Sequence, residues 1–347
     1  MKRSTLLSVV LLGSLSLSGL ISCKKSETAA PGKPWEGDPT KPITLGKFTI
    51  IETLIDGGDQ TEAKRQAENA IAKYNADITA FVGLWSYNAP QILQALKTKS
   101  QEGKIRVFAF DEDASTIAAI SAGNCDGTFA QQPYEFGYQS MKYLKDVIDG
   151  KEIKLDADKA IPVEGKILTK ENMAEFRAKL AELKAGAAAA APAPAGSPKF
   201  AFVVNQSSDF WSYADAGLRK AGADFGIIAE FLTPINGNAS DQNRVLQNIL
   251  QIGDFKGVAI SPVEPDNQTE TLNKLADAMP LICHDSDAPK SKRRFYIGTN
   301  NTDAGREMGK FIKKQLPNGG KLIIAVGSLD ALNAKQRRAG LIEELGK

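Results

Sequence analysis

The sequence is poor in the residues that build metal sites and disulfide frameworks. Among 347 residues there are three cysteines and one histidine, His284. No Cys/His cluster has the spacing of metal ligands, and His284 has no nucleophile at a suitable distance along the chain. Motifs for nucleotide-binding loops and serine hydrolases are also missing. We therefore expect no metal, no cofactor and no catalytic residue, and a core or rim position for His284.

An excess of charge of one sign is missing as well. Basic and acidic residues number 43 and 41, which leaves a formal net charge of +2, and 42% of the residues are apolar. Only Lys292-Arg293-Arg294 forms a tight basic cluster, and so short a run is typical of a solvated loop. The composition predicts a soluble globular protein with no nucleic-acid partner, and the length is enough for two lobes.

The first residues carry a secretion signal rather than a membrane span. Lys2-Arg3 precedes the apolar stretch 6–21, which is too short and too rich in Ser and Gly to span a bilayer comfortably. Leu20-Ile21-Ser22-Cys23 resembles a bacterial lipobox. We predict a signal peptide over 1–22, lipidation at Cys23 and a flexible tether over 23–40, which anchor the protein outside the cytoplasm. A simple secretory signal with an incidental cysteine is the alternative.

The two other cysteines are predicted to be free thiols. Cys283 lies in an apolar stretch and should act as a small core residue, whereas Cys125 lies in a turn next to glycine. One disulfide between them is the alternative in an oxidising compartment.

Two long segments, 41–184 and 199–347, alternate short apolar runs with amphipathic stretches, and the Ala/Pro-rich linker 185–198 separates them. Helical spacing of apolar residues predicts helices over 60–74 and 243–252. This alternation predicts an α/β fold with parallel sheets covered by helices on both faces. The predicted strands are 48–51, 78–84, 105–110, 128–130, 200–204, 227–232, 257–260, 280–283, 295–297 and 322–326.

Parallel sheets bind ligands beyond the carboxyl ends of their strands, so the polar and aromatic residues that follow the predicted strands are candidate ligand contacts. They occur at 205–211, 285–287, 85–88, 111–113 and 131–132.

Several of these segments resemble the ribose-binding branch of the periplasmic binding proteins. Four blocks match the family's first half and lie at 199–347: Asp209-Phe210-Trp211, the stretch 280–285, the stretch 297–306 and the stretch 333–340. The family's second half is found at 46–184, before the first half rather than after it. The resemblance therefore implies a two-lobed type I periplasmic-binding-protein fold in circularly permuted order, with three chain crossings at the hinge.

The chain ends support this permutation. Leu345-Gly346-Lys347 ends the chain and Leu45-Gly46-Lys47 precedes a predicted strand, so joining the copies gives a continuous helix, turn and strand. The linker would then close the family's original termini. We predict one lobe from about 199–319 and 112–150, and the other from about 320–347, 41–111 and 155–168.

The resemblance implies sugar binding, for which aromatic faces and polar edges are needed. The predicted contacts are Phe210, Trp211, Asp285, Asn333, Arg337, Trp85, Asp111, Gln131, Ser208 and Asn88. The alternatives are helix capping or loop solvation for Asp111 and Asp285, and core packing for each aromatic residue. Ser207-Ser208-Asp209, Gly58, Ser286 and Trp85 depart from the ribose pattern, so another pentose or a hexose is expected as readily as ribose.

The implied function is capture of a monosaccharide by hinge closure in a monomer that delivers it to an ABC permease. A sugar-sensing module for chemotaxis or a sensor kinase is the first alternative. A glycan-processing enzyme that uses Asp111 and Asp285 is the second, and a fusion of two incomplete half-genes is the third.

Overall fold

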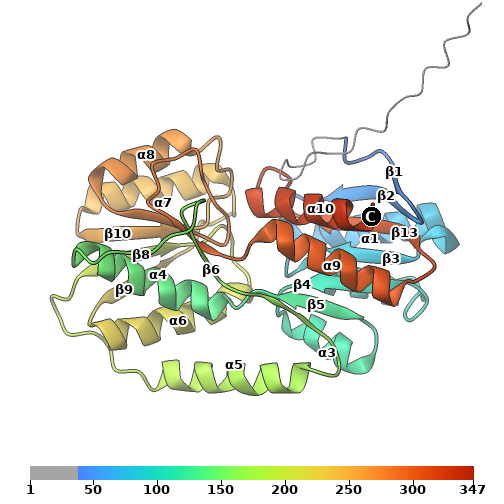
Figure 1. Cartoon of the computed structure of the whole chain (residues 1–347), viewed down its shortest axis with the longest axis horizontal. Coiled ribbons are helices and arrows are strands. Elements are labelled where there is room, and N and C mark those ends of the chain that lie inside the picture. Colours follow the sequence, from blue (N-terminus) through green and yellow to red (C-terminus); the bar gives the residue numbers. More distant parts are fainter. Residues whose placement is uncertain (1–37) are drawn as a thin grey trace, which may run out of the picture. The chain divides into compact units, whose positions relative to one another are not determined.

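A computed structural model describes residues 38–347, which belong to one compact unit, Gly32–Lys347. These residues form two separate sheets of seven and six strands (Figure 1). The α/β class and the helix-covered sheets predicted from the sequence are confirmed. Each sheet with its helices is called a lobe and is named after the aspartate that follows one of its strands, Asp111 or Asp285.

The sheet of the Asp111 lobe is mixed. Its inner strands are parallel, whereas both edge strands, β1 and β7, run antiparallel to their neighbours. The inner strands confirm the predicted parallel sheet, but the sequence did not reveal the antiparallel edge strands, because a three-residue strand shows too little periodicity to be recognised. The order is β1 (Ile43–Leu45), β2 (Phe48–Ile55), β13 (Gly320–Val326), β3 (Ala80–Gly83), β4 (Arg106–Phe110), β5 (Gly127–Ala130) and β7 (Lys166–Leu168).

The sheet of the Asp285 lobe is parallel throughout its described strands. Its order is β6 (Ala160–Pro162), β12 (Tyr296–Gly298), β11 (Leu281–His284), β10 (Phe255–Ile260), β8 (Lys199–Val203) and β9 (Ile228–Leu232). Every strand predicted in Sequence analysis is present, with ends that differ by a few residues.

Apolar residues on both faces of each sheet pack against helices. In the Asp111 lobe one face is covered by α1 (Gln60–Tyr74), α2 (Asn88–Thr98) and α3 (Ala114–Ala122), and the other by α9 (Asn301–Gln315) and α10 (Leu332–Leu345). In the Asp285 lobe α4 (Pro133–Ile148) and α6 (Phe210–Phe225) cover one face, and α7 (Ala239–Ile252) and α8 (Thr269–Ala278) cover the other. A short 3₁₀ helix spans Asn75–Asp77.

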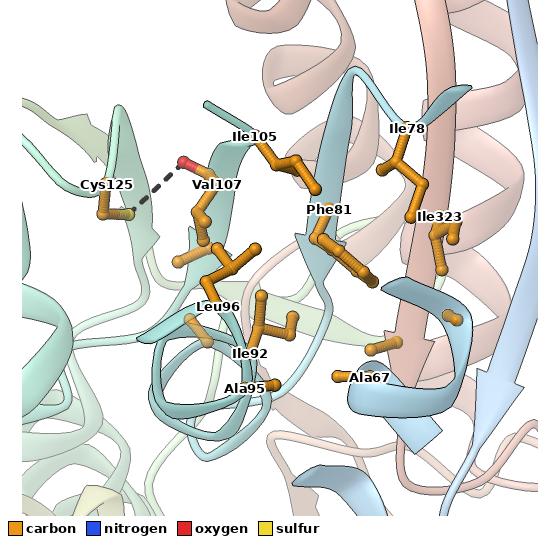
Figure 2. Packing of buried hydrophobic residues seen from close by; sticks show 14 of the residues in the cluster. Ala67, Ile78, Phe81, Ile92, Ala95, Leu96, Ile105, Val107, Cys125 and Ile323 are labelled. Carbon is orange, nitrogen blue, oxygen red and sulfur yellow. Dashed lines mark hydrogen bonds between the residues drawn. The ribbon is translucent and has the colours of Figure 1, made fainter. Parts of the chain in front are cut away.

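Figure 2 shows the face of the Asp111 lobe on which α1 and α2 pack. Phe81 and Val107 point from β3 and β4 toward Ile92 on α2, and all three side chains are inaccessible or nearly so. Full burial of an aliphatic or aromatic side chain contributes about 1.5–3 kcal/mol. This packing holds the strands in place and so fixes where their carboxyl ends lie.

The chain passes between the two lobes four times: at 131–132, at 163–165, from β7 to β8 through 169–198, and at 299–300. The predicted lobe boundaries differ from these positions. Segment 112–130 stays in the Asp111 lobe because β5 pairs with β4, and α9 belongs there because it packs on α10. Strand β6 belongs to the Asp285 lobe because it pairs with β12.

The predicted linker is partly helical. Helix α5 (Met173–Ala188) continues into it, and Ala187 is buried against Tyr134 and Ala216. Alanine has the highest helix propensity of any residue, so an alanine run prolongs a helix that has already begun. The spacer is therefore confined to 189–198.

The predicted signal peptide, Cys23 and most of the tether lie outside the described residues. In the part of the chain from residue 38 onward, no helix has both the length and the apolar character needed to span a membrane.

Candidate functional site

Two buried aspartates occupy equivalent places in the two lobes. Asp111 directly follows β4 and Asp285 directly follows β11. Both have left-handed backbone conformations, with φ of 72° and 57°. Such conformations are unfavourable for residues other than glycine, so the surrounding structure must hold both residues there. Neither caps a helix: Asp113 caps α3 instead.

Each carboxylate is held by a polar side chain that follows a neighbouring strand. Gln131 donates from Nε2 to Asp111 Oδ1. Ser261 donates from Oγ to Asp285 Oδ2 over 2.8 Å. These bonds orient both carboxylates within their own lobes.

Arg337, on α10, lies between the two carboxylates with a side chain only 1% exposed. Its Nη1 donates to the carbonyl oxygen of Leu84 (2.7 Å), and its Nε donates to Asn301 Oδ1 (2.8 Å). Nη1 lies 3.8 Å from Asp111 Oδ2, and Nη2 lies 4.0 Å from Asp285 Oδ1. Both distances exceed hydrogen-bond length, so the guanidinium attracts the carboxylates without saturating them.

Asn333 lies one helical turn before Arg337 on the same face of α10. Its Nδ2 donates to Asp285 Oδ2 over 3.3 Å. Because α10 belongs to the Asp111 lobe, this hydrogen bond joins the two lobes.

Trp85 Nε1, Asn333 Oδ1 and Arg337 Nη2 are buried polar atoms without a hydrogen-bond partner among the described residues, as is Gln131 Oε1 behind Asp111. Unpaired buried donors and acceptors are rare, and each costs about 1–3 kcal/mol. Two donors and one acceptor are thus available to a ligand, in addition to the unsaturated carboxylates.

These residues line one small hollow that is partly open to solvent. Eight of the ten predicted contacts line it: Trp85, Asp111, Ser208, Phe210, Trp211, Asp285, Asn333 and Arg337. The sequence segments from the two ends of the chain therefore converge on one site.

The aromatic residues play different parts. Trp211 is 3% exposed, packs against Phe202 and His284, and donates from Nε1 to Asn205 Oδ1 (3.2 Å). Phe210 is similarly buried, so both rings belong to the core as well as to the wall of the hollow. Trp85 is only half-buried, and its indole lies against Gly327, where a Cβ atom would overlap the ring.

Two predicted contacts do not line the hollow. Gln131 lies behind Asp111 as its hydrogen-bond donor. Asn88 lies behind Trp85, where its Oδ1 accepts from the Trp85 N–H (2.9 Å). Their strand-end positions in the sequence were compatible with direct contact, but their side chains are used by the protein itself.

Three further residues line the hollow: Ser86, Asn205 and Gln206. All lie in the strand-end segments singled out from the sequence, yet residue type alone did not distinguish them from their neighbours. Asn301, which orients Arg337, lies in the 297–306 block of the resemblance but carried no signal of this role.

Burial raises the pKa of Asp111 to about 6, although Arg337 and Gln131 oppose the shift. Burial also raises the pKa of Asp285, again against the effect of Arg337. Next to Asp111, burial raises the pKa of Glu112 to about 8. One guanidinium therefore does not offset the cost of burying two carboxylates, and donors from a ligand would stabilise their charged forms.

His284 is a core residue, as predicted. Its ring stacks on Phe202 with centroids 3.9 Å apart, and burial lowers its pKa to about 3, so the ring is neutral. Cys125 and Cys283 are buried free thiols, also as predicted. Within residues 38–347 no group of His, Cys, Asp or Glu is arranged to hold a metal ion.

A larger hollow lies between β2 and α1. Its charged side chains pair with one another, Arg65 with Glu62 and Lys73 with Glu52. The smaller hollow is the better candidate site, because its buried charges are left for a ligand to complete.

The sequence matches a family model described as a periplasmic binding protein domain over residues 38–152 and 200–347. No curated protein matches the chain. A solved ABC transporter solute-binding protein from Burkholderia graminis, in complex with D-arabinose, is 29% identical with a TM-score of 0.42. That similarity covers 44% of this chain and 53% of that one, so the chain spans about half the length of its relative.

Two other solved structures show similarity of the same extent. A carbohydrate transporter solute-binding protein from Agrobacterium radiobacter, also with D-arabinose, is 26% identical with a TM-score of 0.40, over 44% of this chain and 53% of that one. The fructose-binding periplasmic domain of a hybrid two-component system is 20% identical with a TM-score of 0.39, over 43% and 49%.

Proposed function

Since the chain belongs to the family of periplasmic binding protein domains, we propose that it is an extracytoplasmic protein that captures a monosaccharide between its two lobes. The ligand is a pentose or a hexose, and capture requires no chemical step.

One observation carries this proposal: a carboxylate from each lobe and unpaired buried donors and an acceptor of the Asp111 lobe belong to residues that line one hollow. Arg337 Nη2, Trp85 Nε1 and Asn333 Oδ1 surround it together with the carboxylates of Asp111 and Asp285. A sugar hydroxyl both donates and accepts, so a ring of hydroxyls complements this alternation better than an acid or an apolar ligand does. The apolar faces of Phe210 and Trp211 complement the C–H groups of the sugar.

Capture follows from the division of these groups between the lobes. A sugar that donates to Asp111 and accepts from Arg337 in one lobe donates to Asp285 in the other. Each charge-assisted hydrogen bond contributes about 1.5–3 kcal/mol. The bound sugar thus favours the closed arrangement of the lobes over an open one.

A thermal-shift screen of the purified mature protein against pentoses and hexoses tests the proposal. A ligand that binds only the folded state raises the melting temperature with its concentration. Calorimetry on the best hit should give saturable binding, and incubation should leave the sugar unchanged. A folded protein whose melting temperature no monosaccharide shifts would overturn the assignment, and turnover would favour an enzyme.

We further propose that the closed form delivers its sugar to an ABC permease and that Cys23 carries the lipid anchor. Deletion of the gene should reduce uptake of the labelled sugar. Loss of a transcriptional or chemotactic response with normal uptake would favour the sensing role. A Cys23→Ala variant should incorporate no labelled fatty acid and should leave the membrane fraction.

The permuted order of the two halves is a related proposal. The chain end lies next to the expected seam, because Gly346 is adjacent to the Leu45 side chain. At the other seam, α5 and residues 189–198 connect β7 to β8. The family model matches two segments, 38–152 and 200–347, and the unmatched residues between them include this second seam.

A rearranged chain tests the permutation: it begins at Pro198, runs to Lys347, continues directly at Phe48 and ends at Ala188. It should fold as a monomer and bind the same sugar with the same affinity. Insoluble or non-binding protein from the rearranged gene, alongside a functional original, would contradict the proposal.

A further inference from the structure

A second group of buried polar residues lies behind the candidate site and takes no direct part in it. Asp56 follows β2, and Tyr87 and Asn88 stand between β3 and the first turn of α2. We infer that Asp56, Tyr87 and Asn88 are positioning residues that hold the Trp85 indole at the wall of the hollow. The inference rests on the proposed function for its effect on affinity, but not for its effect on Trp85.

The Asp56 carboxylate accepts three hydrogen bonds. Oδ1 accepts from the Tyr87 hydroxyl and from the N–H of Gly58 (2.9 Å), and Oδ2 accepts from Asn88 Nδ2 (3.0 Å). Asp56 as a whole is only 6% exposed, so water weakens these hydrogen bonds little.

Asn88 passes this constraint on to Trp85. Its side-chain Oδ1 accepts from the Trp85 N–H (2.9 Å), while its own backbone N–H donates to the Trp85 carbonyl (3.0 Å). Trp85 is therefore tied to Asn88 at both of its backbone polar groups, and Asn88 is tied to Asp56. The adjacent Leu84 carbonyl accepts from Arg337, so the same short segment also orients the cation of the site.

The indole ring is confined from two further sides. The Tyr87 ring meets it edge-on, with centroids 6.3 Å apart and an interplanar angle of 71°. On another side lies Gly327, where a Cβ atom would overlap both the indole and the Tyr87 hydroxyl. The N–H of Gly57, next to Asp56, donates to the Gly327 carbonyl over 2.8 Å and keeps this glycine in place.

The indole Nε1 finds no acceptor among the described residues, so this donor is available to a ligand. The Asp56 network thus orients a donor for the ligand while leaving that donor free. Such a supporting layer is what a binding site needs for fixed geometry.

The experiment compares Asp56→Asn, Asn88→Asp and the double variant that carries both changes. In Asp56→Asn the Asn88 amide faces a second amide and loses its carboxylate acceptor. In Asn88→Asp the Asp56 carboxylate faces a second carboxylate and loses its amide donor. The double variant restores a pair of one amide and one carboxylate. The amide at position 56 donates to the carboxylate at position 88, whose other oxygen accepts from the Trp85 N–H. Affinity for the sugar found in the screen should fall about tenfold in each single variant and recover in the double variant.

A spectroscopic signal of Trp85 provides the second measurement. Protein grown with fluorotryptophan gives one ¹⁹F resonance for each of its three tryptophans, and Trp85→Phe identifies the signal of Trp85. That resonance should shift or broaden in both single variants and return in the double variant, without ligand present. Tyr138→Phe is the matched control: it removes another tyrosine–aspartate hydrogen bond, to Asp224 (2.9 Å), away from the hollow.

The outcomes separate the two proposals. If no monosaccharide binds the wild-type protein, the monosaccharide assignment fails, while the ¹⁹F signal still tests the network. An unmoved Trp85 resonance in both single variants overturns the positioning role. A resonance that moves without rescue in the double variant, or that moves equally in Tyr138→Phe, also overturns it.

Discussion

The two lobes place an aspartate at the same point of the fold and surround it differently. Asp111 and Asp285 each follow a parallel strand in a left-handed conformation, and each is buried. Asp111 is bound by Gln131, which follows the neighbouring strand. Asp285 is bound by Ser261 of its own lobe and also by Asn333 of the other.

The difference lies in the origin of the positive charge. Arg337 and Asn333 come from α10, so the Asp111 lobe holds its own carboxylate, the guanidinium and a donor for the opposite carboxylate. The Asp285 lobe contributes a carboxylate and aromatic surface, without a cation among the residues that line the hollow. Attraction between the lobes thus depends on the approach of Asp285 to groups on α10.

The largest expected effect comes from removing the shared cation. In Arg337→Ala both carboxylates lose their nearest positive charge and the ligand loses the Nη2 donor, so affinity should fall about 100-fold or more. Calorimetry on the folded variant measures this loss. Lys335→Ala, on the same helix but not facing the hollow, serves as the control. Undiminished affinity in Arg337→Ala would remove Arg337 from the site.

The aspartates themselves should not be equivalent. Asp285→Asn replaces a carboxylate that joins the lobes, and Asp111→Asn replaces one bound within its own lobe, so we expect the larger loss from Asp285→Asn. Loss of one charge-assisted bond corresponds to about 10- to 100-fold in affinity. Dissociation constants of the two variants give the ranking. Equal losses would show that the asymmetry of contacts has no energetic consequence.

Acidification should weaken sugar binding, because the Asp111 carboxylate takes up a proton. With its pKa raised to about 6, Asp111 takes up a proton below that pH and no longer accepts two ligand hydroxyls. Affinity should therefore fall as pH drops from 7.5 to 5, and the drop should shrink in Asp111→Asn. A flat profile in the wild-type protein contradicts this assignment.

Without ligand, the raised pKa of Asp111 has the opposite effect: acidification stabilises the folded protein. The folded state binds this proton more tightly than the unfolded chain, whose aspartates titrate near 3.9. The contribution of Asp111 to the free energy of unfolding therefore rises as pH falls from about 6 toward 4. Denaturant titration of wild type and Asp111→Asn at pH 7 and pH 5, without ligand, measures that contribution.

The smallest effect is expected at Trp85. Trp85→Phe keeps an aromatic face and removes only the Nε1 donor, so affinity should decrease by about twofold to tenfold. Trp211→Phe is a useful comparison, because Trp211 Nε1 already donates to Asn205 and is not free for a ligand. A loss confined to Trp211→Phe would reverse the roles that we give to the two indoles.

Element type and order followed from local sequence patterns. Helix 60–74 was predicted with its observed ends, and the inner strands were recognised because buried parallel strands read as apolar runs. The short edge strands β1, β6 and β7 were missed, since three residues carry no periodicity. The family was identified from spaced blocks, and the match to periplasmic binding protein domains confirms it.

The sequence predicted only in part which polar residues line the hollow. Asp111 and Asp285 were singled out by the rule that ligands bind beyond strand ends, and Arg337 by the family resemblance; all three line the hollow. Asn88 follows the same rule and yet turns away, because its amide completes the hydrogen bonds of Asp56 and Trp85. Asp56 lies 32 positions before Asn88, so no local pattern contains this contact.

The amino-acid order was sufficient for the α/β architecture, the two segments and the strand-end origin of the site, because each depends on short-range periodicity and on the general geometry of parallel sheets. The tertiary structure alone established that Arg337 lies between Asp111 and Asp285 and that Arg337 Nη2 and Trp85 Nε1 have no partner among the described residues. It also established that Asn301 and Asn88 hydrogen-bond to other residues of the protein. Hydrogen-bond partners are chosen among all groups that folding brings within about 3 Å, and distance along the chain has no bearing on that choice.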